Sequence, residues 1–379
     1  MPFSEVIAQD RALTPLRSAL RRGTLHHGYL FGGPEGVGKA MAARLLAQAA
    51  NCEGGEPAGA GFRDDPCGAC GPCRKIAKGI HPDVIVLHEE RVMAKAGTWE
   101  PKGGRTPSKD VVVDQVRDVV DRRLALKRFE GRHRFVIVDP ADAMNPQAQN
   151  ALLKTLEEPP EDTTLVLVAA SPDSLLPTIR SRCVRVAFGP LPADAIAPRL
   201  EERLPKLLAR RLAELEEGRE EDDAPGPAPD RRAVEAELRE ELSLAVALSG
   251  GSLGRALALF GTLRAHREAV LAAAALDARD AGAWLAFARA HGEDRETAGE
   301  LCDLLLLWWR DVAAAQAGSG ALALGGVRDA TLRVASALSP AEALRRRREV
   351  RATADALRQN ASPVLALEGM LVRWFHHGG

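Results

Sequence analysis

Several features that would place a protein in a specialised class are missing from this chain of 379 residues. No apolar run approaches the ~20 residues that cross a bilayer, and the start, MPFSEVIAQD, lacks the charged and apolar regions of a signal peptide. The formal net charge is −1, so the chain has no overall basic field that would wrap nucleic acid. These absences predict a cytoplasmic protein with no membrane contact, in which any nucleic-acid contact depends on a local patch or a partner.

Cysteine is also scarce, since six residues are too few for a disulfide framework in a chain of this size. Four of the six nevertheless crowd together as Cys52-x14-Cys67-x2-Cys70-x2-Cys73. Four thiolates at this spacing suit one tetrahedral zinc ion in a closed structural site with no position open for catalysis. An iron–sulfur cluster or free thiols are the alternatives. The apolar neighbours of the other two, Cys183 and Cys302, predict buried core residues.

The first half of the chain alternates short apolar runs with helical patterns. Continuous apolar runs are typical of buried parallel strands. After a first run at 28–31 they recur at Val84–Leu87, Phe135–Val138, Leu165–Ala169 and Val184–Phe188. Helical patterns occupy Asp10–Arg22, Val112–Leu126 and Pro146–Glu157. We therefore predict a doubly wound α/β domain with a parallel sheet over residues 1–188, with the cysteine module at 52–73 inserted in it.

Beyond about residue 190 the composition changes to Ala, Leu, Arg and Glu at helical spacing, which predicts an all-α remainder. We expect a small helical domain over 189–262 and a second helical domain over 263–379. The charged stretch 216–232, EEGREEDDAPGPAPDRR, contains three prolines and predicts a flexible surface insertion. Leu304–Leu307 with Trp308 and Trp309 is too apolar for a surface helix and indicates either core or a subunit interface.

A glycine loop, GGPEGVGK, follows the first apolar run directly. Gly33, Gly38 and Lys39 fit the pattern G-x-x-x-x-G-K-[ST], in which backbone N–H groups bind phosphates and the lysine reaches the outer ones. Ala40 stands where the magnesium-binding hydroxyl belongs. The loop predicts a P-loop fold whose Gly33, Gly36, Gly38 and Lys39 could hold ATP or ADP without magnesium. A loop that binds no nucleotide is the alternative.

Asp139 ends the apolar run at 135–138, and a carboxylate at the carboxyl end of a strand is how an ATPase holds its magnesium-bound water. In AAA+ ATPases a glutamate normally follows and polarises the attacking water. Here the next residue is Pro140, which has no group for that chemistry. We therefore do not expect this site to hydrolyse ATP.

Three segments carry a family resemblance: Asp139–Asn145 (DPADAMN), Asn150–Pro160 (NALLKTLEEPP) and Ser181-Arg182-Cys183 before a strand. They resemble the bacterial clamp-loader family of AAA+ proteins. In that family the serine-arginine-cysteine motif supplies an arginine finger to the ATP of the neighbouring subunit, which implies this role for Arg182. The resemblance covers residues 1 to about 190, extends to the helical lid, and reaches the C-terminal helices only through length and composition.

Within this family the motor subunits are called gamma or tau, and the delta-prime subunit keeps the fold with a degenerate site. This chain departs from the motor pattern at Ala40, at Pro140 and at Gly254. The motor lid reads GSLRDA, with an arginine that senses the γ-phosphate, whereas 251–256 reads GSLGRA and its Arg255 lies about 100° further around the helix.

The resemblance is thus to delta-prime, which implies an accessory subunit of the DNA polymerase III holoenzyme that is not an enzyme on its own. Its implied partners are gamma/tau motor subunits, the delta subunit and, through the complex, the sliding clamp and primed DNA. The family also implies zinc in the cysteine module and an oligomerising collar formed by the C-terminal helices.

Two other readings of the sequence stay open. One is a self-sufficient gamma/tau-type ATPase, and the other is a zinc-dependent nucleic-acid-binding module. Locally basic stretches at Arg345–Arg348 and in the region 122–134 are interpreted as solvated helix faces, with DNA phosphate contact as the alternative. The neighbouring His26 and His27 lack a metal-binding spacing, so we assign them no chemistry.

Overall fold

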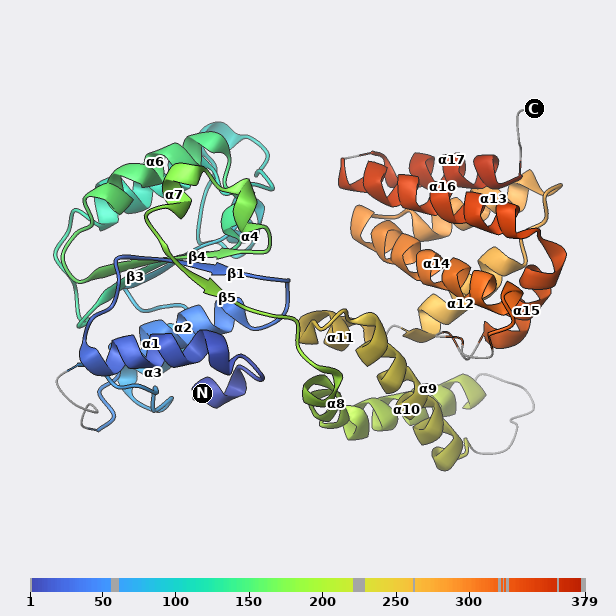
Figure 1. Cartoon of the computed structure of the whole chain (residues 1–379), viewed down its shortest axis with the longest axis horizontal. Coiled ribbons are helices and arrows are strands. Elements are labelled where there is room, and N and C mark those ends of the chain that lie inside the picture. The colour runs from blue at the N-terminus through green and yellow to red at the C-terminus, as the bar shows by residue number, and fades with distance from the viewer. Residues whose placement is uncertain are drawn as a thin grey trace. The chain divides into compact units, whose positions relative to one another are not determined.

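The computed structural model describes residues 2–55, 61–220, 229–261, 263–319, 322, 324, 327–359 and 361–375. Its contacts divide the chain into two compact units, which Figure 1 shows. The first unit contains residues 1–199 and 249–256, and the second contains residues 200–248 and 257–379. The short segment 249–256 therefore packs with the nucleotide fold, although it follows the helices of the second unit in the sequence. The division into three domains stays a prediction.

The first unit is built on a five-stranded parallel sheet with the order β2-β3-β4-β1-β5. The strands are β1 (Gly28–Gly32), β2 (Val84–Leu87), β3 (Arg134–Val138), β4 (Thr163–Ala169) and β5 (Val184–Ala187). Figure 1 shows helices α1 (Asp10–Arg22), α2 (Lys39–Ala50) and α3 (Gly71–Ala77) on one face, and α4 (Glu90–Lys95), α6 (Pro146–Glu157) and α7 (Pro177–Arg180) on the other. Because both faces are covered, β1, β3 and β4 are buried throughout. The predicted doubly wound α/β fold is confirmed.

The structure corrects two local expectations. β5 was expected to be buried, but three of its four residues are exposed, because it is an edge strand that pairs with β1 alone. The helix expected over 112–126 is shorter: α5 (Val113–Arg117) continues as a π-helical segment, η3 (Asp118–Arg123). The guanidinium of Arg134 donates hydrogen bonds to the carbonyls of Leu124 and Leu126, which fixes the chain outside a helix there.

The described residues beyond β5 form helices only, as expected. In order they are α8 (Ala193–Glu201), α9 (Leu204–Glu220), α10 (Arg231–Leu248), α11 (Leu253–Leu259), α12 (Leu263–Ala274), α13 (Ala281–His291), α14 (Arg295–Gln316), α15 (Arg328–Ala337), α16 (Pro340–Arg358) and α17 (Pro363–Phe375). Before β5, in the first unit, short 3-10 segments lie at Phe3–Glu5, Lys102–Gly104, Ala141–Ala143 and Pro172–Ser174. Helical structure thus covers both ends of the predicted insertion 216–232, and residues 221–228 lie outside the described part.

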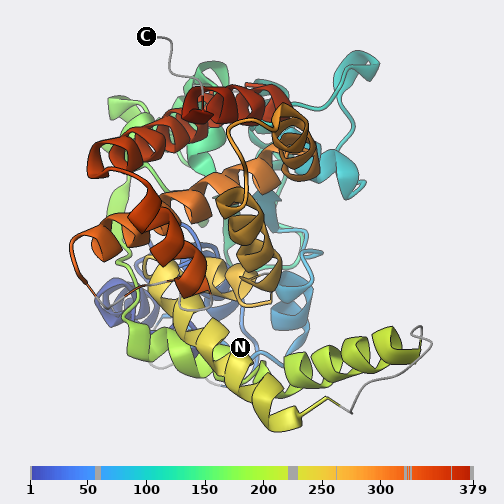
Figure 2. The ribbon, with the colours of Figure 1, turned by 90° about the vertical axis from the view of Figure 1, so that its right-hand side faces the viewer.

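The second unit has its own core around α14, which packs against α12, α15, α16 and α17, as Figure 2 shows from the side of this bundle. Trp308 and Trp309 of α14 are buried together with Trp374 of α17 and Cys302. For the two neighbouring tryptophans the structure therefore decides in favour of core. None of the described helices is long and apolar enough to span a bilayer.

Candidate nucleotide loop, arginine finger and metal centre

The glycine loop joins the carboxyl end of β1 to the first residue of α2, which is the edge of a parallel sheet where ligands bind. Gly33, Gly36 and Gly38 have φ angles of 150°, 69° and 101°, which side chains rarely allow. A Cβ on Gly33 would also overlap the carbonyl oxygen of Phe188. The glycines are therefore required by the path of the loop, whether or not a phosphate is bound.

Lys39 is the first residue of α2, and its side chain is turned into the loop that precedes it. Its Nζ donates hydrogen bonds to the carbonyls of Gly33 (2.6 Å) and Pro34 (2.5 Å). Burial lowers the pKa of Lys39, and the charges of Glu35, Asp139 and Asp142 act in the opposite direction. The ammonium thus lies at the loop, where it could contact phosphate oxygens, although it now has carbonyl partners. Ala40 follows with a methyl group in place of an oxygen ligand.

Asp139 follows β3 and therefore lies at the same carboxyl edge of the sheet as the glycine loop. Burial raises the pKa of its carboxyl, while His88, Arg44 and Lys39 act to lower it. The backbone carbonyl of Asp139 lies 2.6 Å from Nδ1 of His88. Nothing at Pro140 can accept a proton from water. The structure thus brings Asp139 and Lys39 to one site without a second carboxylate at position 140.

The segment 251–254 lies against the glycine loop, which fits the family resemblance of this segment to a phosphate-sensing lid. The backbone N–H of Gly254 donates a 3.1 Å hydrogen bond to the carbonyl of Gly36. A Cβ on Gly254 would lie 3.0 Å from the Cα of Gly36, and a Cβ on Gly36 would overlap Oγ of Ser252. Gly36 is therefore needed for this close approach, and Gly254 allows it without a shift of the neighbouring backbone. Residues so far apart in the sequence leave no periodic signal that could have predicted the contact.

Arg182 lies at the amino ends of the strands, opposite the carboxyl ends that hold the glycine loop, because it directly precedes β5. Its carbonyl oxygen packs against Gly28, the first residue of β1, whereas the glycine loop follows Gly32, the last one. Five residues of strand separate these two positions by roughly 13 Å. The Arg182 side chain is partly exposed and pairs with Glu157 at 2.8 Å. Glu157 belongs to the segment Asn150–Pro160 that carries the family resemblance, but this motif predicts no role for it.

The neighbour of this arginine, Cys183, is only partly buried and packs against the margin of the core, so the predicted buried core residue is confirmed only in part. It lies at the amino end of the exposed edge strand. Burial still raises the pKa of its thiol to about 12. The structure places His26 and His27 beside the same edge, with their rings 4.1 Å apart between centroids.

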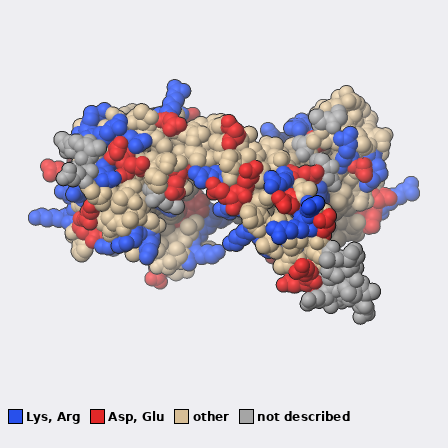
Figure 3. Space-filling view, turned by 90° about the horizontal axis from the view of Figure 1, so that it is seen from below, with Lys and Arg blue, Asp and Glu red and all other residues tan. Residues whose placement is uncertain are grey.

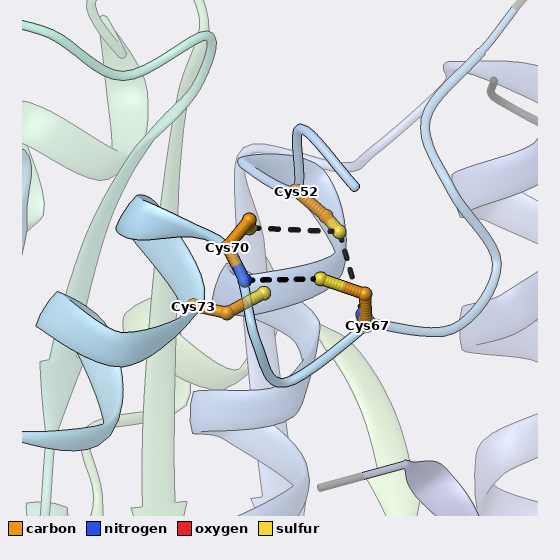
Figure 4. A group of neighbouring side chains, drawn as sticks. All are labelled: Cys52, Cys67, Cys70 and Cys73. Atoms are coloured by element: carbon orange, nitrogen blue, oxygen red, sulfur yellow. Dashed lines mark hydrogen bonds between the residues drawn. The ribbon is translucent and has the colours of Figure 1, made fainter. Parts of the chain in front are cut away.

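The structure brings the four clustered cysteines together, as Figure 4 shows. Cys52 follows α2, Cys67 lies in the loop, Cys70 caps the start of α3 and Cys73 lies within that helix. All four Sγ atoms lie within 4.8 Å of one another, and those of Cys52 and Cys70 are 4.0 Å apart. Thiolates about 2.3 Å from a central zinc ion would lie ~3.8 Å from each other. The four residues can therefore hold one metal ion.

Backbone N–H groups point at the sulfur atoms of this cluster. The amides of Ala69 and Cys70 donate to Sγ of Cys67 at 3.4 and 3.3 Å, and the amide of Cys67 donates to Cys52. Burial acts to raise the pKa of the Cys67 thiol, but hydrogen bonds from the amides of Ala69 and Cys70 and from the thiols of Cys52 and Cys70 outweigh it and lower the pKa to about 6. A Cβ on Gly54 would overlap Sγ of Cys67, so the glycine leaves the space that this sulfur occupies. Such donors stabilise thiolates, the form that binds metal.

The basic stretches are used largely within the chain. In the first, Arg134 is buried beside Asp83 and is therefore not part of a solvated face, which corrects that expectation for this residue. In the second, Arg345 and Arg346 pair with Glu342, and the guanidinium of Arg346 lies 4.8 Å from the ring centre of Phe375. On the face that Figure 3 shows, acidic and basic side chains are interspersed.

A parallel sheet whose first strand leads through a glycine loop and a lysine into a helix defines a P-loop nucleotide-fold protein. Residues 8–192 match the family described as DNA polymerase III, delta subunit. The chain is 42% identical to DNA polymerase III subunit delta' of Pseudomonas aeruginosa over 190 residues, which are 50% of this chain and 51% of that relative. This segment, residues 8–192, belongs to the family of DNA polymerase III clamp-loader subunits.

A tau subunit is similar to a longer part of the chain. It is 34% identical to DNA polymerase III subunit tau of Escherichia coli over 269 residues, which are 69% of this chain and 36% of that relative. A solved DNA polymerase III gamma subunit-related protein of Thermotoga maritima has 18% identity and a TM-score of 0.42, with 96% of this chain and 98% of that chain covered. The chain spans about half the length of the delta' relative and about a third of the tau relative.

Proposed function

We propose that this chain is a delta-prime-type subunit of the DNA polymerase III clamp loader. Its similarity to a delta' subunit and its departures from the motor pattern at Ala40, Pro140 and Gly254 support this assignment. In this role it assembles with gamma/tau motor subunits and a delta subunit in the cytoplasm. The complex then loads the sliding clamp onto primed DNA.

The observation that carries the proposal is the position of Arg182. It is partly exposed at the amino edge of the sheet, and the length of β1 separates it from the chain's own glycine loop. A guanidinium there cannot reach a phosphate held by Gly33–Lys39 of the same chain, but it can reach the nucleotide of a subunit packed against this edge. An arginine finger supplied in this way contributes about 10³- to 10⁵-fold in rate. Arg182 therefore serves the neighbouring ATPase site.

The chain's own site contributes no hydrolysis in this proposal. Phosphates could bind to the amides of Gly36 and Gly38 and to Lys39, but Ala40 supplies no magnesium ligand. Asp139 is the one carboxylate of the predicted set, and Pro140 cannot activate water. Nucleotide binding, ATP or ADP, would therefore be structural, and turnover would come from the motor subunits.

The cysteine cluster is proposed to hold structural zinc through Cys52, Cys67, Cys70 and Cys73. Four thiolates close the coordination sphere, so the ion would stabilise the 52–73 module without taking part in a reaction. About one zinc per purified chain is the expected result of elemental analysis. Iron in its place would favour the cluster alternative, and a metal content near zero would exclude both.

Reconstitution tests the function. The chain is combined with motor and delta subunits, and DNA-stimulated ATP turnover and clamp loading are measured for the wild type and for Arg182→Ala. We expect turnover to fall by at least about 10³-fold at the site that the finger serves, and clamp loading to fail. Unchanged turnover and loading would show that Arg182 is not a finger. Arg185 is exposed on the edge strand β5, which follows Arg182, and Arg185→Ala therefore serves as the matched control.

The second candidate is a gamma/tau-type ATPase, which the longer similarity to a tau subunit favours. That function requires hydrolysis by the purified chain and its loss in Lys39→Ala, whereas the delta-prime assignment expects no turnover in either. The sequence also left open a zinc-dependent nucleic-acid-binding module. That function requires tight, salt-sensitive binding of DNA by the isolated chain.

A further inference from the structure

The backbone at Arg182 is fixed by its own unit. The Arg182 amide donates to the carbonyl of Ile179 at 3.1 Å, and the Arg182 carbonyl lies over Gly28, where a Cβ would approach it to 3.3 Å. The His27 ring is also hydrogen-bonded to the backbone of Arg182. This bond acts to raise the pKa of His27, but burial and the neighbouring His26 lower it overall. The backbone of this arginine is thus held by partners in its own unit, whereas its side chain is partly exposed.

The guanidinium is held by two acceptors of the same subunit. Nη1 donates to the carbonyl of Thr178 at 3.0 Å, and Nη2 lies 2.8 Å from Oε1 of Glu157, the last residue of α6. The side chains of Arg182 and Glu157 are 36% and 50% exposed, so water competes for both groups. Beside them is an open hollow of about 470 Å³ lined by His27, Leu156, Glu157 and residues 181–184. The guanidinium therefore has room to leave its present partners.

We propose that Glu157 is a positioning residue that holds the guanidinium of Arg182 against its own subunit and releases it when the phosphates of a neighbour's nucleotide compete for the same N–H donors. This inference rests on the proposed finger role. A carboxylate and a phosphate both accept from guanidinium N–H groups in the same paired geometry, so one can replace the other. No covalent step is involved.

The strength of the pair fits a hold that can be released. Exposed ion pairs change an equilibrium by less than about fivefold. A phosphate group, which carries more charge, can outweigh such a pair once the subunits close. Without a nucleotide in the adjacent site the carboxylate keeps the guanidinium engaged. In the assembled complex it still competes with the phosphates for the guanidinium, which limits finger action. Glu157 therefore acts through Arg182 and touches no nucleotide itself.

The isolated full-length chain provides the first test, which needs no partner and no activity. The rate at which phenylglyoxal modifies Arg182 is measured by mass spectrometry for the wild type, Glu157→Gln and the control Glu158→Gln. Glu158 is the exposed carboxylate next in the chain, at the end of the same helix. We expect modification about two- to fivefold faster in Glu157→Gln and unchanged in Glu158→Gln. An unchanged or slower rate in Glu157→Gln would overturn the proposal, provided that both variants unfold at the wild-type urea concentration.

The second test uses the reconstituted clamp loader. In Glu157→Gln we expect ATP turnover without DNA to rise about two- to fivefold in kcat while the KM for ATP stays constant. Combined with Arg182→Ala, the substitution should have no further effect. A fall in kcat, or an effect that persists in the Arg182→Ala background, would overturn the role of Glu157. If Arg182→Ala alone changes nothing, the proposed finger fails, a result that the labelling experiment in the isolated chain cannot produce.

Discussion

The backbone N–H of Gly254 is hydrogen-bonded to the carbonyl of Gly36, which joins the segment 249–256 to the glycine loop of the nucleotide fold. The two glycines approach so closely that a side chain on Gly254 would meet the Cα of Gly36 at 3.0 Å. A motor-type arginine at position 254 would therefore require the loop or the segment to shift by a few tenths of an ångström. The residue that differs from the motor lid is thus the residue that permits this contact.

The contact predicts unequal effects of two glycine substitutions. Gly36 and Gly79 have nearly the same φ angle, 69° and 70°, but a Cβ would overlap Oγ of Ser252 at Gly36 and meets nothing within 4 Å at Gly79. Gly79→Ala should lower the free energy of unfolding by about 1 kcal/mol through backbone strain alone. Gly36→Ala should cost about 1–3 kcal/mol more, because Ser252 and Gly254 must move. Urea unfolding of both variants measures the difference, and equal losses would contradict the contact.

At the metal site we expect that the removal of a single thiolate is enough to release the ion. Cys67→Ser should reduce zinc from about one per chain to near zero and lower the free energy of unfolding by more than about 2 kcal/mol, since the binding free energy of structural zinc is folding free energy. Cys183 lies outside the cluster, so Cys183→Ser should retain the zinc. Elemental analysis and urea unfolding provide the two readouts. Full zinc occupancy in Cys67→Ser would show that this cysteine is not a ligand.

His133 predicts a pH dependence of stability. Its ring packs against Phe62 and Phe135, Nε2 lies 2.8 Å from Oγ1 of Thr164, and burial lowers its pKa to about 4. An unfolded chain binds a proton at this histidine below about pH 6.5, and the folded chain excludes it until about pH 4. This contribution is therefore complete above pH 6.5 and is lost as the pH falls.

The loss attributable to this group is up to about 3 kcal/mol between pH 6.5 and 4. Urea unfolding across this range should show a shallower decline in His133→Phe than in the wild type. The comparison removes the contributions of the other titrating groups, which both proteins share. Parallel curves would mean that His133 does not carry the proton uptake.

We expect that removal of the buried charge of Asp83 strongly lowers the free energy of unfolding. Its carboxylate accepts hydrogen bonds from the amides of Phe129, Glu130 and Gly131 at 2.7–3.1 Å and lies 3.8 Å from Nε of the buried Arg134. Asp83→Asn should lower the free energy of unfolding by about 3 kcal/mol, because the arginine loses its buried counter-charge.

The exposed pair between Arg128 and Asp162 is the matched control for this prediction. Its atoms are 2.9 Å apart, but 38% and 53% of the two side chains are exposed. Asp162→Asn should therefore cost less than about 1 kcal/mol. Similar losses in the two variants would show that burial does not distinguish these ion pairs.

The sequence by itself determined the parts of this protein that depend on local pattern. Continuous apolar runs predicted the five strands, and in β1, β3 and β4 the reason holds that a strand covered on both faces needs no polar alternation. The spacing of Gly33, Gly38 and Lys39 predicted the loop, and the spacing of the four clustered cysteines predicted a group of thiolates that suits one metal ion. The missing magnesium ligand at Ala40 and the missing water-activating group at Pro140 could be inferred from the sequence, because both are side-chain groups at fixed motif positions.

Only the tertiary structure decided the relations between distant segments. It showed β5 at an edge, Glu157 beside Arg182, Gly254 against Gly36 and Arg134 buried beside Asp83. None of these follows from a period of two or 3.6, because each depends on how separate elements pack and on which edge of the sheet they meet. Burial likewise changed Arg134 from a member of a basic stretch into an interior ion pair. The spacing of residues thus predicts local motifs, whereas the packing of the whole unit determines which residues are in contact.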